Sequence, residues 1–360
     1  MLATACTLLV SSVWGQITLL NGPEGIAYDT GSQSYFVTNA TDGKIIKIDN
    51  SWTQSIIYEG LNVPMGIHYV GDTLWVSSND PSTISCINAS SGELLGSFEI
   101  TESQSMAHMD YDPRGHRLYV IGQQGQCFRV DTETLVYDEF IPAGSGLSIS
   151  SQTCSVDTLN NCLYVFSWPA TYVRKVNLDD PGDIENVVNP GWGQYIDCVS
   201  DPDGNIYVSS WQDNLIHVYA PGCGSQPAVF STGYDKPAGL VYNPDQNSIA
   251  ICNYEGNYID EIELGTTGTN DKSGHDVVLN IFPNPVHSSL HFSCNLPGSS
   301  NLEIIVFTMQ GKMVYSGMID PASGRAYTHT ISSLDFMPGV YSLVVRANGR
   351  TYASSRFIKL

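Results

Sequence analysis

Three ionisable side chains stand at matching places in a pattern that the chain repeats. They are Glu24, His108 and Asp197, each near the start of a short strand-like run. Carboxylates beside an imidazole can hold a transition metal or transfer protons, because histidine titrates near neutral pH. The sequence therefore offers one candidate site for metal or acid–base chemistry. The alternative is that the two carboxylates accept hydrogen bonds from backbone amides at the rim of a channel.

Three aromatic side chains occupy a second matching position, at the ends of other runs: Trp168, Trp211 and Tyr254. Neighbouring aromatic faces stack on sugar rings or hold peptide side chains. Two earlier repeats carry Asn79 and Gln123 at this place. The polar residues expected to add hydrogen bonds are Ser167, Ser209, Ser210 and Asn253. A platform for a glycan or protein ligand is one interpretation, and ordinary packing between sheets is the other.

Both sets belong to a pattern that recurs six times within residues 16–265. Each copy has a strand that begins near Pro-x-Gly, a turn rich in Asp, Asn and Gly, a strand of the type apolar-aromatic-Val-Ser, and further short strands. The second strands match from Phe36 to Ala250 at spacings of 39, 44, 45, 43 and 43 residues. This period is typical of β-propeller blades. We therefore expect an all-β fold with a six-bladed β-propeller over residues 16–265, whose inner strands surround a central channel.

The two ends of the repeated region suggest how the ring closes. The sixth repeat supplies three strands and stops at Gly265, whereas residues 17–20 form a strand-like run without a partner. Because closure removes exposed sheet edges, we expect this first strand to complete blade six. Residues 266–276 are polar and predict a linker.

The last part of the chain, residues 277–360, contains seven short β-rich runs separated by turns such as Pro338-Gly339. This spacing predicts a small seven-stranded Ig-like β-sandwich. Its ordered motifs contain Pro283, Asn284, Pro285, Gly311, Pro338, Gly339, Tyr341 and Lys359. In that order they resemble the C-terminal sorting domain of the type IX secretion system. The resemblance implies contact with the secretion machinery and a protein that is secreted or attached to the outer-membrane surface. An Ig-like binding module is the alternative.

The first residues agree with export. Residues 1–15 form an apolar run that ends at Trp14-Gly15 and lacks a basic start, which indicates a signal peptide, possibly truncated. A buried first strand is the alternative. No other run approaches the ~20 apolar residues of a membrane helix, so we expect no membrane span.

Charge and cysteine content restrict the partners. Residues 16–265 hold 8 Lys or Arg against 31 Asp or Glu, a net charge of −23, whereas residues 277–360 carry +3. Such an acidic surface repels phosphate backbones, which argues against nucleic acid, and it is compatible with divalent cations. Eight cysteines follow residue 15 without a Cys-x-x-Cys pair or a histidine-spaced cluster, so neither zinc nor thiol redox chemistry is indicated.

The repeats resemble the NHL and gluconolactonase-like propellers, including senescence marker protein, in runs such as Pro23-Glu24-Gly25 and Asp201-Pro202-Asp203-Gly204-Asn205. The resemblance implies a channel that can hold a divalent cation such as calcium, with Glu24 as the first-blade ligand and Asp197 one residue from the family's Asp. The family's asparagine ligands are missing, since other residues stand there. These residues are Met65, Ala107 and Gln152.

That departure matters because calcium takes six to eight oxygen ligands. We therefore expect a secreted or surface-attached binding or interaction module rather than an enzyme. One alternative is a metal-dependent lactonase or lyase of the gluconolactonase type, with His108 as a base. Another is a structural protein of the cell surface.

Overall fold

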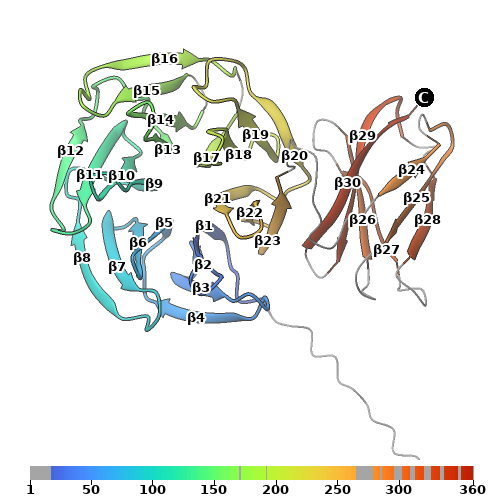
Figure 1. Ribbon diagram of the computed structural model, residues 1–360, viewed down its shortest axis with the longest axis horizontal. Helices are drawn as coiled ribbons and strands as arrows, with labels where there is room; N and C mark the ends of the chain where they lie inside the picture. The colour runs from blue at the N-terminus through green and yellow to red at the C-terminus, as the bar shows by residue number, and fades with distance from the viewer. Residues whose placement is uncertain are drawn as a thin grey trace, which may run out of the picture.

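The computed structural model describes residues 18–169, 172–191, 193–264, 279–283, 286–295, 302–308, 313–319, 326–332, 336–347 and 350–359 (Figure 1). This part of the chain contains thirty β-strands and no helix. The all-β prediction is confirmed. Among these residues no helix has the length and apolarity to span a membrane. The expected signal peptide (residues 1–15) and linker (residues 266–276) lie outside the described residues.

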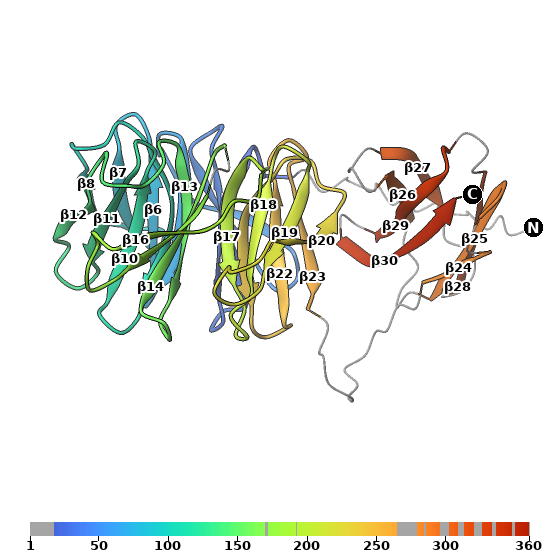
Figure 2. The same cartoon turned by 90° about the horizontal axis from the view of Figure 1, so that it is seen from above.

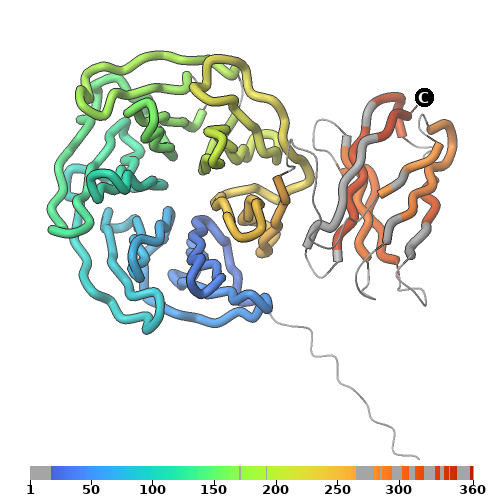
Figure 3. Tube along the Cα trace, viewed as in Figure 1, coloured from blue at the N-terminus to red at the C-terminus, as the bar shows by residue number. Residues whose placement is uncertain are grey.

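The strands before residue 265 form six antiparallel sheets arranged in a ring (Figures 1 and 3), as predicted. Blades one to three contain β1 (Pro23–Asp29), β2 (Ser34–Asn39), β3 (Lys44–Ile48), β4 (Gln54–Glu59); β5 (Pro64–Val70), β6 (Thr73–Ser78), β7 (Thr83–Asn88), β8 (Leu94–Glu99); and β9 (Met106–Asp112), β10 (Arg117–Gly122), β11 (Gln126–Asp131), β12 (Tyr137–Ile141). Blades four to six contain β13 (Ser151–Asp157), β14 (Cys162–Ser167), β15 (Val173–Asn177), β16 (Ile184–Val188); β17 (Tyr195–Ser200), β18 (Ile206–Ser210), β19 (Leu215–Tyr219), β20 (Ala228–Thr232); and β21 (Pro237–Asn243), β22 (Ser248–Asn253), β23 (Tyr258–Glu263).

Burial within each blade follows from the stacking of sheets around the ring. Second strands such as β2, β14 and β22 are buried along their whole length, because both of their faces contact neighbouring blades. Outer strands such as β4 and β8 are exposed along one side. The first strand of each blade lies at the ring axis (Figure 1). Residues at the starts of these six inner strands therefore converge.

One hydrogen bond repeats in all six blades and fixes the alignment that the sequence suggested. The backbone N–H just after each second strand donates to a carbonyl just before the inner strand, over 2.8–3.2 Å. The pairs are Ala40 to Gly22, Asn79 to Val63, Gln123 to Ser105, Trp168 to Ser150, Trp211 to Gln194 and Tyr254 to Lys236. The matched positions therefore lie at one end of the ring, which we call the entrance end.

The predicted closure of blade six is wrong in the described part of the chain. Residues 18–20 form no strand, and β23 pairs only with β22. The turn between these two strands holds the N-terminal segment instead, since the Asn257 side chain accepts a hydrogen bond from the Gly22 N–H over 2.7 Å. Leu20 is buried in a core cluster with Ile259 and Cys252. Side-chain packing and direct contact between β1 and β21 close the ring.

The C-terminal domain is the predicted seven-stranded sandwich, seen beside the ring in Figure 2. One sheet has the order β24-β25-β28, and the other has the order β27-β26-β29-β30. The bounds are β24 (Asn280–Phe282), β25 (Ser289–Asn295), β26 (Leu302–Thr308), β27 (Met313–Ile319), β28 (Ala326–Ser332), β29 (Gly339–Ala347) and β30 (Arg350–Lys359). Apolar residues from both sheets meet between them in one core cluster.

Two of the sorting motif residues, Tyr341 and Lys359, are buried in this sandwich. The Tyr341 ring stacks between Phe336 and Phe357, with ring centres 5.3 and 5.5 Å away, and its hydroxyl donates to the Met337 carbonyl over 2.6 Å. Lys359 is buried on the last strand. Pro283, Pro338 and Gly339 lie in the described part, whereas Asn284, Pro285 and Gly311 lie outside it.

Candidate functional site

The ring brings Glu24, His108 and Asp197 together at its axis, although they come from blades one, three and five. The His108 Nε2 lies 3.6 Å from a Glu24 oxygen, and its Nδ1 lies 3.3 Å from Asp197 Oδ1. All three residues are buried, with exposed fractions of 3%, 2% and 7%. Inner-strand glycines let the backbones approach, since a Cβ at Gly239 would lie 2.5 Å from the Glu24 carbonyl oxygen.

Asp197 already has a partner on each carboxylate oxygen besides the imidazole. The Thr153 hydroxyl donates to Oδ1 over 2.9 Å, and the Leu240 backbone N–H donates to Oδ2 over 3.0 Å. The Asp197 N–H in turn donates to the Ser209 hydroxyl over 3.0 Å. These bonds connect blades four, five and six. They agree with the interpretation of Asp197 as a carboxylate bonded to the backbone at the channel rim.

His108 is the cation between these two carboxylates. Burial alone would lower the pKa of the imidazole. Attraction to Asp197, the hydrogen bond that the imidazolium donates to Asp197, and the interaction with Glu24 together outweigh burial and raise the pKa to about 10. This direction favours the imidazolium at neutral pH, the form that pairs with both carboxylates, and a role of His108 as a base stays a prediction. Within the described ranges no group of three His, Cys, Asp or Glu side chains is arranged to hold a metal ion.

Two further titratable residues lie on the inner strands of blades two and three, and the sequence reasoning missed both. Burial lowers the pKa of His68 to about 4, so its imidazole is neutral. Burial also raises the pKa of Asp110 to about 6, although the Val156 N–H donates to its carboxylate over 2.7 Å. Both occupy the fourth position of the inner-strand alignment, whereas the prediction considered only the first two. Extending the alignment by two residues would have found them.

The aromatic residues predicted as a platform do form a continuous row at the entrance end. The ring centres of Trp168 and Trp211 are 5.6 Å apart, and those of Trp211 and Tyr254 are 5.2 Å apart. Each ring packs on the core with one side and remains partly exposed. The Lys236 Nζ lies 5.7 Å from the centre of the Trp211 ring. We call Trp168, Trp211 and Tyr254 the aromatic row.

Amide side chains occupy the same end of blades two to four. The Ser105 hydroxyl donates to Gln123 Oε1 over 2.8 Å, and Gln123 Nε2 donates to Gln152 Oε1 over 2.9 Å. Asn79 Oδ1 accepts from the Met106 N–H over 2.6 Å. Asn79 and Gln123 are partly exposed. We call Asn79, Gln123 and Gln152 the amide arc.

The four polar residues expected to flank the aromatic row are not available to a ligand. Ser167, Ser209, Ser210 and Asn253 are all buried. Ser209 bonds across its own blade to Asp197, and Asn253 accepts the Asp235 N–H over 3.0 Å. These residues belong to strands that are buried on both faces, so neither alternating set of side chains is exposed.

The fold and the residues at its axis define a β-propeller carrying a C-terminal sandwich. Residues 280–359 match the family described as the secretion system C-terminal sorting domain. This part of the chain is therefore the sorting domain that its motifs indicated. The protein is exported, either secreted or attached to the cell surface, and its sorting domain contacts the secretion machinery.

Comparisons of the ring support the gluconolactonase-like resemblance at the level of fold. Regucalcin from Agrobacterium tumefaciens strain C58, described as a calcium-binding protein, has a TM-score of 0.52 and 12% identity, covering 66% of this chain and 83% of its own. Diisopropyl-fluorophosphatase of Loligo vulgaris is 22% identical over 150 residues, which cover 39% of this chain and 46% of that protein. The chain thus spans about half of this curated relative.

Proposed function

We propose that the exported propeller is a binding module whose ligand lies on the aromatic row at the entrance end. The observation that carries the proposal is three contacting rings that pack on a core cluster and remain partly exposed. Packing between blades alone does not need aromatic residues that stay partly exposed. Aromatic faces in such a row suit the apolar faces of sugar rings.

The chemistry around the row favours a glycan over an apolar protein segment. The amide arc offers donors and acceptors beside the rings, which match sugar hydroxyls. The backbone of Gln123 connects the two groups. The Gln123 backbone carbonyl accepts the Ser150 N–H over 2.6 Å, and the Ser150 backbone carbonyl accepts the Trp168 N–H over 2.8 Å. Trp211 Nε1 is buried and finds no acceptor among the described residues, so the ligand would contact the ring of Trp211 rather than its N–H.

The ion network at the axis supports binding rather than metal-dependent catalysis. A divalent cation there would have to displace the His108 imidazolium, which is already paired with Glu24 and Asp197. Repulsion between two cations within one buried site is costly. The alternative of a gluconolactonase-type enzyme draws its support from the fold and from Glu24 in the first-blade position.

A glycan array followed by titration calorimetry tests the proposal. We expect a glycan ligand whose affinity falls on Trp211→Ala. The matched control is Trp52→Ala, because Trp52 follows β3 at the opposite end of the ring and should leave affinity unchanged. Silence on the array, with Trp211→Ala indistinguishable from the parent on every surface tested, would refute binding through the row.

Metal analysis of the purified protein separates the enzyme alternative from the binding proposal. We expect substoichiometric calcium and zinc after dialysis. Stoichiometric metal, together with hydrolysis of sugar lactones that disappears on Glu24→Ala, would replace the binding proposal by a lactonase. The structural alternative would be favoured by an absence of ligands combined with tight association with outer-membrane material.

A further inference from the structure

Blade six is incomplete among the described residues. The outer position that β4, β8, β12, β16 and β20 fill in the other blades has no strand beside β23. An uncovered edge of this kind presents unpaired backbone groups to other chains. Yet Ile259, Asp260 and Glu261 of β23 are buried, with exposed fractions of 5%, 0% and 4%.

The sorting domain has an apolar face that its own core does not use. Ile304 and Val306 of β26 point into the sandwich core, so the alternate residues Ile305 and Phe307 point outward. Val344 of β29 pairs with Ile305 and shares its direction. These three outward residues are only 4–6% exposed and form a cluster of their own. Something outside the sandwich therefore covers them.

Contacts identify blade six as the cover at one end of this cluster. A Cβ added at Gly233, in the turn between β20 and β21, would lie 2.6 Å from the Phe307 ring. Gly233 has a φ of +100°, so glycine is needed there for conformation as well as for space. Strands β23 and β30 also lie in contact. The views in Figures 1 and 2 both place the sandwich against this side of the ring.

A buried ion pair joins the two domains beside the same turn. The Arg346 guanidinium of β29 donates to Asp260 Oδ2 over 2.7 Å and to the Gly233 carbonyl over 3.2 Å. It also lies 4.9 Å from the centre of the Tyr258 ring. Burial opposes the charge of Arg346, but attraction to Asp260 outweighs it and raises the arginine pKa. A charge pair this well bonded fixes one orientation of the two domains.

We propose that the sorting domain is docked on the propeller as the cover of its incomplete sixth blade, so that ring and sorting domain form one folded unit. The occupant of the blade-six edge is this chain's own outward face of β26 and β29. The opposite net charges of the two parts, −23 and +3, agree with the pairing. Loss of the domain would uncover Asp260 and the free edge of β23.

The test keeps the full chain and cuts it after folding. A protease site placed within residues 266–276 is cleaved in the purified protein, and the products are examined by size exclusion and native mass spectrometry. We expect the two pieces to remain a 1:1 complex at micromolar concentration. Separation of the pieces, or a ring that pairs with a second ring after cleavage, would overturn the proposal.

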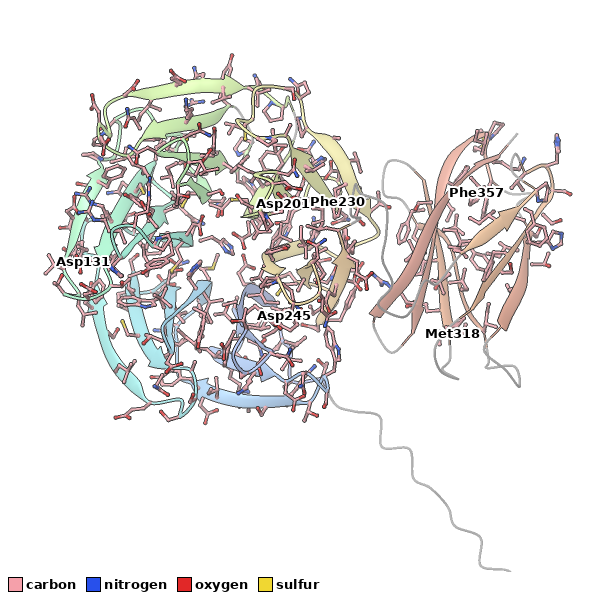
Figure 4. The ribbon with its side chains drawn as sticks, in the orientation of Figure 1. Asp131, Asp201, Phe230, Asp245, Met318 and Phe357 are labelled. Atoms are coloured by element: carbon pink, nitrogen blue, oxygen red, sulfur yellow. The ribbon has the colours of Figure 1, made fainter. Side chains whose placement is uncertain are left out.

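Two variants test which residues hold the two pieces together. Arg346→Ala should weaken the cleaved complex by about thirty-fold or more, because it leaves Asp260 without its charge partner. Met318→Ala is the matched control, since Met318 (Figure 4) lies on the same face of the sheet but is 64% exposed. Hydrogen exchange of Tyr258–Glu263 in the uncut protein provides a second measurement. Equal exchange in the parent and Arg346→Ala would contradict the docking.

Discussion

The axis of the ring and its entrance end both gather polar or aromatic side chains from several blades, but they differ in burial. At the axis, Glu24, His108 and Asp197 are buried, His108 is ion-paired with both carboxylates, and Asp197 has further partners on both oxygens. At the entrance end, Trp211 and Gln123 remain partly exposed beside other aromatic and amide groups. Convergence of chemistry-bearing residues therefore does not by itself make a site. Exposure to a ligand distinguishes the two regions, since the axis residues are buried and the entrance residues are partly exposed.

The largest effect is expected from removing His108, the cation at the axis. His108→Gln should lower the free energy of unfolding by about 3–5 kcal/mol, because two buried carboxylates lose their counter-charge. Urea denaturation measures the change. His116→Gln in the same blade is the control, since its ion pair with Glu133 is exposed and should contribute less than about 1 kcal/mol. A loss for His108→Gln no larger than for this control would show that the network is not structural.

Alkaline pH should weaken the same network without a mutation. The folded-state pKa of His108 is raised above its unfolded value of about 6.5, so its contribution is complete below that pH and is lost as the pH rises through about 10. We expect a decrease on the order of 2–4 kcal/mol between pH 7 and pH 10.5. Other groups that titrate in this range, such as tyrosines, are common to the parent and to His108→Gln. His108→Gln should lack this part of the pH dependence. Parallel curves of unfolding free energy against pH for the parent and His108→Gln would refute the assignment to His108.

The sequence predicted the fold more completely than it predicted the site. Repeat spacing predicted six blades, because each blade must bury two sheet faces with the same strand and turn chemistry. It failed at closure, since the residues around Leu20 have a strand-like composition but are held by the side chain of Asn257 and by packing on Ile259. Strand propensity reports a half-buried surface and does not specify a pairing partner.

The alignment also brought the correct three residues to the axis but gave no account of their charge. Whether His108 acts as a base or as a counter-ion depends on distances of 3.3 and 3.6 Å between blades that are far apart in sequence. The docking of Arg346 on Asp260 was out of reach for the same reason, because alternation along β29 does not reveal what covers its outward face. The pKa of such a group depends on its three-dimensional neighbours.

Replacing Trp211, the middle residue of the aromatic row, tests the binding role of the entrance end. Trp211→Ala should cost about 1–3 kcal/mol of ligand binding, roughly ten- to hundredfold in affinity, because Trp211 contacts both of its neighbours. The free energy of unfolding should change much less than in His108→Gln, since the Trp211 side chain is partly exposed. Calorimetric titration and urea denaturation together separate these effects. Loss of stability without loss of affinity would make the row an ordinary packing contact.

The smallest effect should come from the amide arc. Gln123→Ala removes the donor to Gln152 and one exposed hydrogen-bonding group at the entrance end. A single neutral hydrogen bond contributes about 0.5–1.5 kcal/mol, so affinity should fall roughly two- to tenfold. The control is Gln246→Ala, because Gln246 is exposed in the turn between β21 and β22, at the other end of the ring. If Gln123→Ala and this control bind alike while Trp211→Ala binds weakly, the ligand contacts the aromatic row alone and the site covers only half of the entrance end.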